Sequence, residues 1–524
     1  MKILCNIIIV ASSFIFIVLS QAQQISSAIS SVPTTPQPAI VARDANSRVW
    51  QWIENDEGPN GQTVQRTHSF TELASGLCYG QNGQWMDSQE QINILPDGSA
   101  EAIQGEHQVY FPAGIYNGVI TLVTPDGLQL KSQPIGLSYD DGTNTVLIGE
   151  LTNSIGQLIA SNQVVYTNAF TGVDADLLYT YRKGGFEQDV IFREQPPEPE
   201  QFGLSSASAR LQMLTEFFSP PAPVEYVGPV NPQDGLQDTT LTFGAMKMVQ
   251  GKAFLMNTIN PRDNQGQIPV YKSLATVDGR TVLIEQVPYQ RISAQLATLP
   301  SPPATGATTA NLTKASPKRW LPPARFAQVT TNSMRLAKSD LKQKSGVVFD
   351  YVTINSGETN YTFHGDTTYY VSGEYDLSGT TVIEGSAIIK MANGGELDID
   401  DSDGDPNATI SCETAPYRPA IFTSVNDDTI GEPIWNISSG SPSYQDVGAF
   451  LVMNDSTNIA LHDVRFSYSL SAIDQNAYPS SVTIRDCQFD HEHHRQLEHD
   501  RGRRHHDPRW ERQHRRRQSR LGFG

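Results

Sequence analysis

NIALHDVRFSY (residues 458–468) and SVTIRDCQFDH (residues 481–491) are two copies of one pattern in a chain of 524 residues. Each copy alternates apolar with other residues and then places an aspartate three positions before a phenylalanine. The two aspartates, Asp463 and Asp486, are 23 residues apart. A repeat in the twenties with short strands predicts a parallel solenoid, in which each coil buries its inward residues only by stacking on its neighbours.

The texture of this repeat extends upstream to about Val347. Short apolar runs such as TTYYVSGEYDLSG (residues 367–379) and TTVIEGSAIIKMANGGELDID (residues 380–400) recur there without regular hairpin turns. We therefore expect residues 347–490 to form part of a parallel β-helix.

A different pattern precedes it in residues 48–298. Alternating runs meet at tight turns, at Asp97-Gly98, Asp126-Gly127, Asp141-Gly142, Gly184-Gly185 and Asp278-Gly279. Glycine supplies the positive φ that such turns need, and aspartate tolerates it. This pattern predicts an antiparallel β-sandwich or barrel-like domain. QPPEPEQ (residues 195–201) opens a connector that allows a subdomain boundary near 195–208, and the Pro-rich stretch within residues 299–346 predicts a linker.

Two stretches resemble known proteins. Residues 367–490, with GTTVIEG (379–385) and AIIK (387–390), resemble the opening coils of bacterial right-handed parallel β-helix proteins. Residues 162–194 resemble a β domain near the N-terminus of large secreted or surface proteins of environmental bacteria, some of which carry β-helix or Rhs-type repeats. The resemblance implies a mainly β fold, an N-terminal antiparallel domain followed by the first coils of a right-handed parallel β-helix, and an extracellular setting. It implies no reaction.

The N-terminus predicts export. Residues 1–22 combine Lys2, an apolar run from Ile7 to Leu19, and Ser20-Gln21-Ala22 as a cleavage site. An uncleaved anchor is the alternative, although the run is shorter than the ~20 residues that a span needs. We expect a secreted or cell-surface protein with a flexible leader at residues 23–47 and no transmembrane segment after cleavage.

The charge distribution divides the chain at residue 490. The formal net charge is −19, and residues 491–524 contribute ten Arg and five acidic residues, or +5, so residues 1–490 carry −24. An acidic body argues against nucleic acid as a partner. The His- and Arg-rich segment 491–524 is interpreted as a disordered basic tail, or as the product of a changed reading frame that replaces further coils.

One acidic cluster is a candidate metal site. ELDIDDSDGDPNATI places five carboxylates within eight residues, namely Asp398, Asp400, Asp401, Asp403 and Asp405. Ca²⁺ takes six to eight oxygen ligands, so this cluster could bind it. The EF-hand register fails, because Ile399 and Ile410 would take ligand positions. A solvated acidic turn between coils is the alternative.

No residue is predicted to be catalytic. Serine-hydrolase, zinc-protease, Walker and dinucleotide motifs are absent from the sequence. Asp463, Arg465, Arg485 and Asp486 are the candidates if the β-helix is an enzyme, because stacked carboxylates raise each other's pKa. Their recurrence favours turn residues instead, since a turn residue is needed in every coil and a catalytic residue only once.

The remaining candidates concern recognition and redox state. Arg418 could bind a sugar or carboxylate, but pairing with Asp427 or Asp428 is the favoured expectation. A carbohydrate-stacking strip could be formed by Tyr361, Phe363, Tyr369, Tyr370 and Tyr375, although the adjacent Tyr369 and Tyr370 must face opposite sides of a strand. Cys412 and Cys487 could pair across coils, or each could be a small buried apolar residue.

Together these features predict a non-enzymatic protein with a binding or scaffolding role. Its expected partners are extracellular polysaccharide or surface components. The alternative is a polysaccharide lyase or glycoside hydrolase built on the β-helix. No cofactor is predicted apart from the candidate Ca²⁺.

Overall fold

The computed structural model describes residues 37–228, 230–256, 268–302, 321–322, 333–337, 345–355, 357–399, 408–453, 459–475 and 482–490. The predicted signal segment, most of the predicted leader and linker, and the basic tail 491–524 lie outside these residues. The described chain is mainly β, with one short α-helix among its elements, α1 (Tyr289–Leu296).

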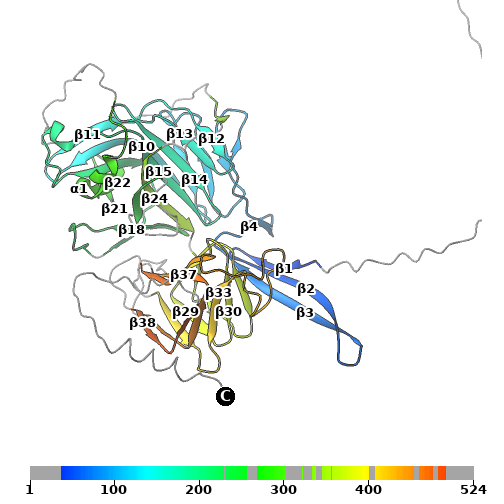
Figure 1. Ribbon diagram of the computed structural model, residues 1–524. Coiled ribbons are helices and arrows are strands. Elements are labelled where there is room, and N and C mark those ends of the chain that lie inside the picture. Colours follow the sequence, from blue (N-terminus) through cyan, green and yellow to red (C-terminus); the bar gives the residue numbers. More distant parts are fainter. Residues whose placement is uncertain are drawn as a thin grey trace, which may run out of the picture. The chain divides into compact units, whose positions relative to one another are not determined.

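A nearly closed, barrel-like sheet occupies the middle of the chain (Figure 1). Its strands are β6 (Asn93–Ile94), β7 (Ala100–Ala102), β8 (Gln108–Phe111), β9 (Ile120–Val123), β10 (Gln129–Asp140), β11 (Thr145–Glu150), β12 (Gln157–Ala160), β13 (Gln163–Tyr166), β14 (Ala175–Tyr181), β15 (Gly185–Phe192), β16 (Arg210–Phe217), β17 (Val224–Val227), β18 (Thr239–Phe243), β19 (Met246–Met248), β20 (Gly251–Leu255), β21 (Ile268–Val277), β22 (Arg280–Pro288), β23 (Arg335–Leu336) and β24 (Val347–Asn355). A 3-10 helix, Pro199–Phe202, lies between β15 and β16. Neighbouring strands run antiparallel except for the β12–β23 pair.

The predicted hairpins are confirmed. At the β21–β22 turn both Asp278 (φ 52°) and Gly279 (φ 78°) are left-handed, as a two-residue hairpin turn requires. Gly98, Gly127 and Gly142 also have positive φ. The β14–β15 hairpin forms at the expected place, but its glycines are not in the left-handed region.

Large tyrosines fill the interior of the barrel-like sheet. Tyr139, Tyr166 and Tyr181 are fully buried within its apolar core. Their hydroxyls donate to the backbone carbonyls of Pro197, Pro112 and His107 at 2.9, 2.6 and 3.0 Å. Each hydroxyl therefore has the partner that burial demands.

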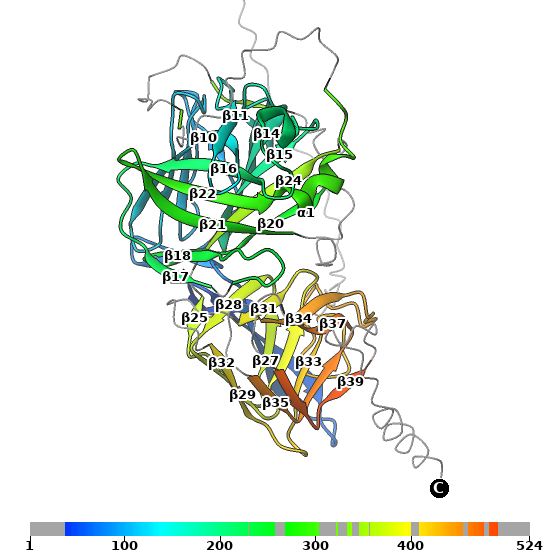
Figure 2. The same ribbon diagram turned by 90° about the vertical axis from the view of Figure 1, so that its left-hand side faces the viewer.

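A second region, residues 358–490, has a three-strand period and is called the parallel region below. Each strand pairs in parallel with the third strand after it in the chain, with the exception that β32 forms no ladder with β35. Figure 2 shows the resulting rows. Its strands are β25 (Glu358–Thr359), β26 (Thr362–Phe363), β27 (Thr368–Val371), β28 (Glu374–Ser378), β29 (Thr380–Glu384), β30 (Ile388–Met391), β31 (Glu396–Ile399), β32 (Thr409–Glu413), β33 (Ala420–Ser424), β34 (Val447–Met453), β35 (Ile459–His462), β36 (Val464–Ser467), β37 (Ser469–Gln475), β38 (Val482–Arg485) and β39 (Gln488–Asp490).

Inward apolar side chains stack from level to level in this region. Phe422, Phe466 and Phe489 occupy matching positions on β33, β36 and β39. Their ring centroids are 5.1 Å apart in the first pair and 5.4 Å in the second, and both pairs are stacked. One continuous apolar core therefore runs through the levels.

Sheet membership differs from the predicted boundaries at both ends of the barrel-like sheet. β1 (Ala39–Asp44), β2 (Ser47–Glu57) and β3 (Thr63–Leu73) form an antiparallel meander, and β3 pairs in parallel with β27. These strands fall in the predicted leader and antiparallel domain, yet they join a sheet of the parallel region. Leu73 explains the choice, because it is fully buried in that region's core.

The second difference is β24, which was expected to open the β-helix. It pairs instead with β15, β19 and β20 of the barrel-like sheet. Val347 and Phe349 are buried in the barrel core. The predicted linker 299–346 therefore lies between two strands of the same sheet, β22 and β24.

Candidate metal centre

Two neighbouring strands of the parallel region carry acidic residues on the face opposite the core. β28 and β31 pair in register, with Glu374 beside Glu396 and Asp376 beside Asp398. Residues between them, Tyr375 and Leu397, point into the apolar core. Because side chains alternate along a strand, all four acidic groups share the outer face.

Three of these groups converge. One carboxylate oxygen from each of Glu374, Glu396 and Asp398 lies within 4.8 Å of the other two. Two oxygens on opposite sides of a Ca²⁺ ion are about 5 Å apart, since each lies at 2.3–2.6 Å from the metal. The three carboxylates therefore have a spacing that one hard divalent cation can span.

The local electrostatics favour a bound positive charge. Glu396 is half-buried and Asp398 is buried, while Glu374 is exposed. Burial raises the pKa of Glu396 to about 7, and the neighbouring charges of Glu374 and Asp474 add to the rise while Lys252 opposes it. Crowded carboxylates that are hard to ionise become fully charged when a metal ion binds them.

Only one member of the predicted metal cluster enters this group. Asp398 lies in β31, whereas Asp400, Asp401, Asp403 and Asp405 lie outside the described residues. Sequence reasoning missed Glu374 and Glu396, although a signal was present. They are 22 residues apart, close to the spacing of Asp463 and Asp486.

The candidates for acid–base chemistry occupy matching turns. His462 pairs with Arg485 in adjacent strands, so Asp463 and Asp486 follow at equivalent positions. Both aspartates are left-handed, with φ of 49° and 53°. This backbone geometry favours the turn interpretation, because aspartate tolerates a conformation that most residues avoid.

Their side chains make local pairs. Asp463 lies 3.0 Å from the His462 ring, and Asp486 lies 3.9 Å from Arg485 on the surface. Arg465 contacts Asp490 at 3.3 Å.

The expected partner of Arg418 is wrong. Its guanidinium lies 3.7 Å from Asp366 and donates to Ser386. A tight turn with mutual backbone hydrogen bonds between Ala415 and Arg418 directs the side chain toward neighbouring levels. Asp427 is buried and accepts hydrogen bonds from Thr423 and Thr429 instead.

The predicted aromatic strip is also wrong, because its rings are core residues. Phe363, Tyr369 and Tyr375 are buried in the inner core of the parallel region, and Tyr361 packs against it. Tyr370 is buried on the other side of the sheet, in an outer aromatic cluster. The expectation that Tyr369 and Tyr370 face opposite sides is confirmed.

The described cysteines are free thiols. Cys412 and Cys487 are each half-buried and pack against the core, and burial raises the pKa of both. Cys78 is fully buried, and burial together with the charge of Asp87 raises its pKa to about 11. Thiols with raised pKa values are poor nucleophiles at neutral pH.

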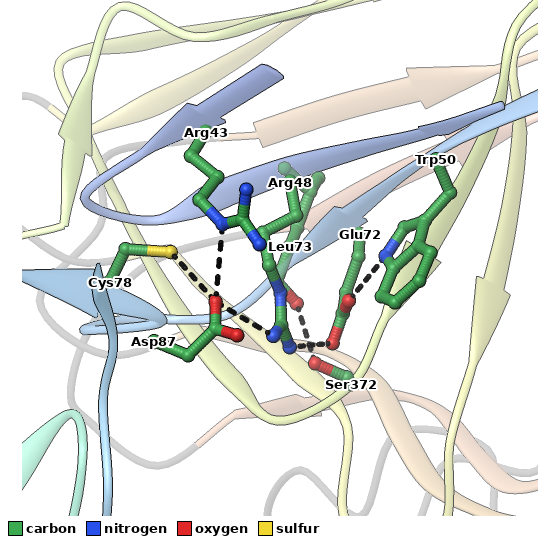
Figure 3. Close-up of polar contacts among 8 residues, drawn as sticks. All are labelled: Arg43, Arg48, Trp50, Glu72, Leu73, Cys78, Asp87 and Ser372. Atoms are coloured by element: carbon green, nitrogen blue, oxygen red, sulfur yellow. Dashed lines mark hydrogen bonds and ion pairs between the residues drawn. The ribbon is translucent and has the colours of Figure 1, made fainter. Parts of the chain in front are cut away.

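Cys78 borders a charged network that holds two hairpins together (Figure 3). Arg48 contacts Glu72 at 2.7 Å and Asp87 at 3.3 Å, so it links β2 to β3 and to the hairpin of β4 (Cys78–Gln81) and β5 (Gln84–Asp87). The Trp50 indole donates to the other oxygen of Glu72 at 2.7 Å. Each carboxylate is neutralised within the network, which is therefore a structural feature.

In the described part of the chain, no helix is both long and apolar enough to cross a membrane. Comparisons with models of known protein families, with curated proteins and with solved structures found no match to this chain.

Proposed function

We propose that this chain is a secreted or cell-surface protein that works by binding or scaffolding, without catalysis. Its parallel region would be the first coils of a right-handed parallel β-helix. The three-strand period and the stacked phenylalanines support this, since stacking of coils is how a solenoid buries its core. The export signal at residues 1–22 supports the location.

We further propose that Glu374, Glu396 and Asp398 bind Ca²⁺. The observation that carries this is the convergence of three carboxylates within 4.8 Å on two paired strands. The ion would bridge two successive levels of the scaffold. Such a role suits a structural protein, because a ligand that binds only the folded state stabilises it by mass action.

Thermal unfolding in Ca²⁺ and in a chelator tests this proposal. At a Ca²⁺ concentration 100-fold above Kd, the wild-type protein should gain about 2.7 kcal/mol of stability. Glu396→Gln should abolish the Ca²⁺-dependent gain, and calorimetric titration should show no binding. Glu413→Gln makes the same change on exposed Glu413 in β32 and should keep the full response. A wild-type protein indifferent to Ca²⁺ would refute the metal site.

A carbohydrate-cleaving enzyme is the second candidate. The observation in its favour is that Glu396, with a pKa raised to about 7, could act as a general acid beside other carboxylates. Purified protein incubated with acidic polysaccharides and Ca²⁺ decides between the two. Cleavage that Glu396→Gln removes would establish the enzyme, and intact polymer would leave the binding role.

A further inference from the structure

A lysine, an aspartate and a glutamate meet inside the barrel-like domain. Lys272 on β21 lies directly opposite Glu285 on β22. Glu285 is 2% exposed, and the Lys272 side chain is 1% exposed. Asp238, just before β18, contacts the Lys272 ammonium at 2.6 Å.

The surroundings of this group are apolar. On β22, Leu283 and Val287 flank Glu285 on the same face and belong to the barrel core. On β21, Val270 lies two residues before Lys272 and belongs to the same core. Charged side chains are rarely placed among such neighbours, because desolvation costs several kcal/mol per ion.

The Asp238 carboxylate is held in place. Its Oδ1 accepts a hydrogen bond from the Lys272 backbone N–H at 2.7 Å, and its Oδ2 accepts one from Lys272 Nζ at 2.6 Å. The loop that ends at Asp238 is fixed as well, since Asp234 accepts hydrogen bonds from Tyr271 at 2.8 Å and from Arg291 at 2.7 Å. A nitrogen this close to one carboxylate oxygen is also near the carboxyl carbon, at about the 3–3.5 Å of a reactive approach.

Glu285 is suited to carry a proton. Burial raises its pKa to about 8, the charge of Asp238 adds to the rise, and Lys272 opposes it. At neutral pH its carboxyl group is therefore mainly protonated. A neutral acid beside an amine and a carboxylate can give a proton to one and take a proton from the other.

We propose that Lys272 and Asp238 become joined by an intramolecular isopeptide bond, with Glu285 as the proton shuttle. Glu285 protonates the Asp238 carboxylate and receives a proton from the Lys272 ammonium. The neutral amine attacks the Asp238 carboxyl carbon, a C–N bond forms, and a C–O bond breaks to release water. One ammonium and one carboxylate thus yield one amide and one water, with no oxidant or cofactor.

The bond would tie β21 to the residue that opens β18, closing a chain segment between positions 34 residues apart. β19 and β20 would lie inside this closed segment. Covalent closure restricts the unfolded chain, as a disulfide does. It would do so without cysteines, consistent with the free thiols described above.

Intact-mass spectrometry of the denatured full chain tests the proposal. The wild-type protein should be lighter than its sequence by one water, and proteolysis should yield a branched peptide joining Lys272 to Asp238. Lys272→Met and Glu285→Gln should both show the full mass and separate peptides. Glu216→Gln alters another buried glutamate of the same sheet, paired with Arg280, and should remain one water lighter.

Full mass and unbranched peptides in the wild-type protein would overturn the proposal, whatever the behaviour of the variants. A branched peptide that persists in Glu285→Gln would overturn the role of Glu285. Because the wild-type measurement needs no variant, a variant that fails to fold leaves the proposal open to refutation.

Discussion

His68 Nδ1 and Glu432 Oε2 lie 2.7 Å apart, although 364 residues separate them in the chain. His68 also stacks on Trp52, with ring centroids 5.0 Å apart, and lies 3.4 Å from Glu54. Trp52 contacts Trp435, which follows Glu432 closely, at 6.4 Å. The β2–β3 hairpin and the segment between β33 and β34 are thus joined by an aromatic cluster outside the main cores.

Trp52→Ala should release this junction. The side chain is 8% exposed, so its removal should cost about 3 kcal/mol. Hydrogen exchange should accelerate in β2, β3 and residues 425–446, while the barrel-like sheet keeps its protection. Val64→Ala, on an exposed side chain of β3, is the matched control and should change little. Uniform protection in Trp52→Ala would contradict the prediction.

Stability without metal should fall as pH rises from 4.5 toward 7. The pKa values of Glu106 and Glu396 are both raised to about 7 from 4.5, mainly by burial. The folded state then binds more protons than the unfolded state, so this stabilisation is complete below pH 4.5 and is lost as pH rises through 7. Melting temperatures measured in chelator across this range should decline less in the Glu106→Gln, Glu396→Gln double variant. An equal decline would show that other groups dominate.

The stacked phenylalanines should differ in their contribution to stability. Phe466 is fully buried between two rings, whereas Phe489 is 38% exposed. Phe466→Ala should cost about 4 kcal/mol, near the middle of the range for buried aromatic residues. Phe489→Ala should cost clearly less. Urea unfolding measures both, and similar costs would contradict the prediction.

The same gradient supports the expectation that Ile459–Phe489 is the least stable part of the parallel region. Residues of β38 and β39 are exposed or half-buried, while those of β33 are mostly buried. Amide exchange should therefore be fastest in the last described strands. Stronger protection there than in β30 and β33 would refute it.

Asp463 offers a test of the turn interpretation. Asp463→Ala should destabilise the protein by about 1 kcal/mol, because alanine tolerates a left-handed φ poorly. Asp463→Gly should be close to neutral for the folded conformation. If both variants lose equal stability, the carboxylate rather than the backbone would be the important group.

Local signals predicted local structure well. Asp278-Gly279 fixed a hairpin because its two residues alone provide the left-handed φ values that the turn needs. The spacing of Asp463 and Asp486 predicted equivalent turns, since the repeat is written in the sequence itself. The adjacent Tyr369 and Tyr370 were correctly assigned to opposite faces by strand alternation alone.

Long-range partners could not be read in the same way. Nothing near Leu73 indicates that it packs beside strands 300 residues later, because an apolar residue fits either core. Arg418 was assigned to nearby aspartates, yet it reaches Asp366 on a neighbouring level. The metal candidate shows the same limit, since Glu374 and Glu396 meet only through strand register.

The pairing of β3 with β27 bears on how the chain can be assembled during synthesis. Thr71 is made early, but its partner Tyr369 emerges only after the entire barrel-like domain. Such a high contact order slows folding, because the loop must close before the pairing stabilises anything. The first hairpin must therefore wait with an open edge, and a barrel that folds promptly on its own would shorten the search by bringing its two chain ends into a fixed relation.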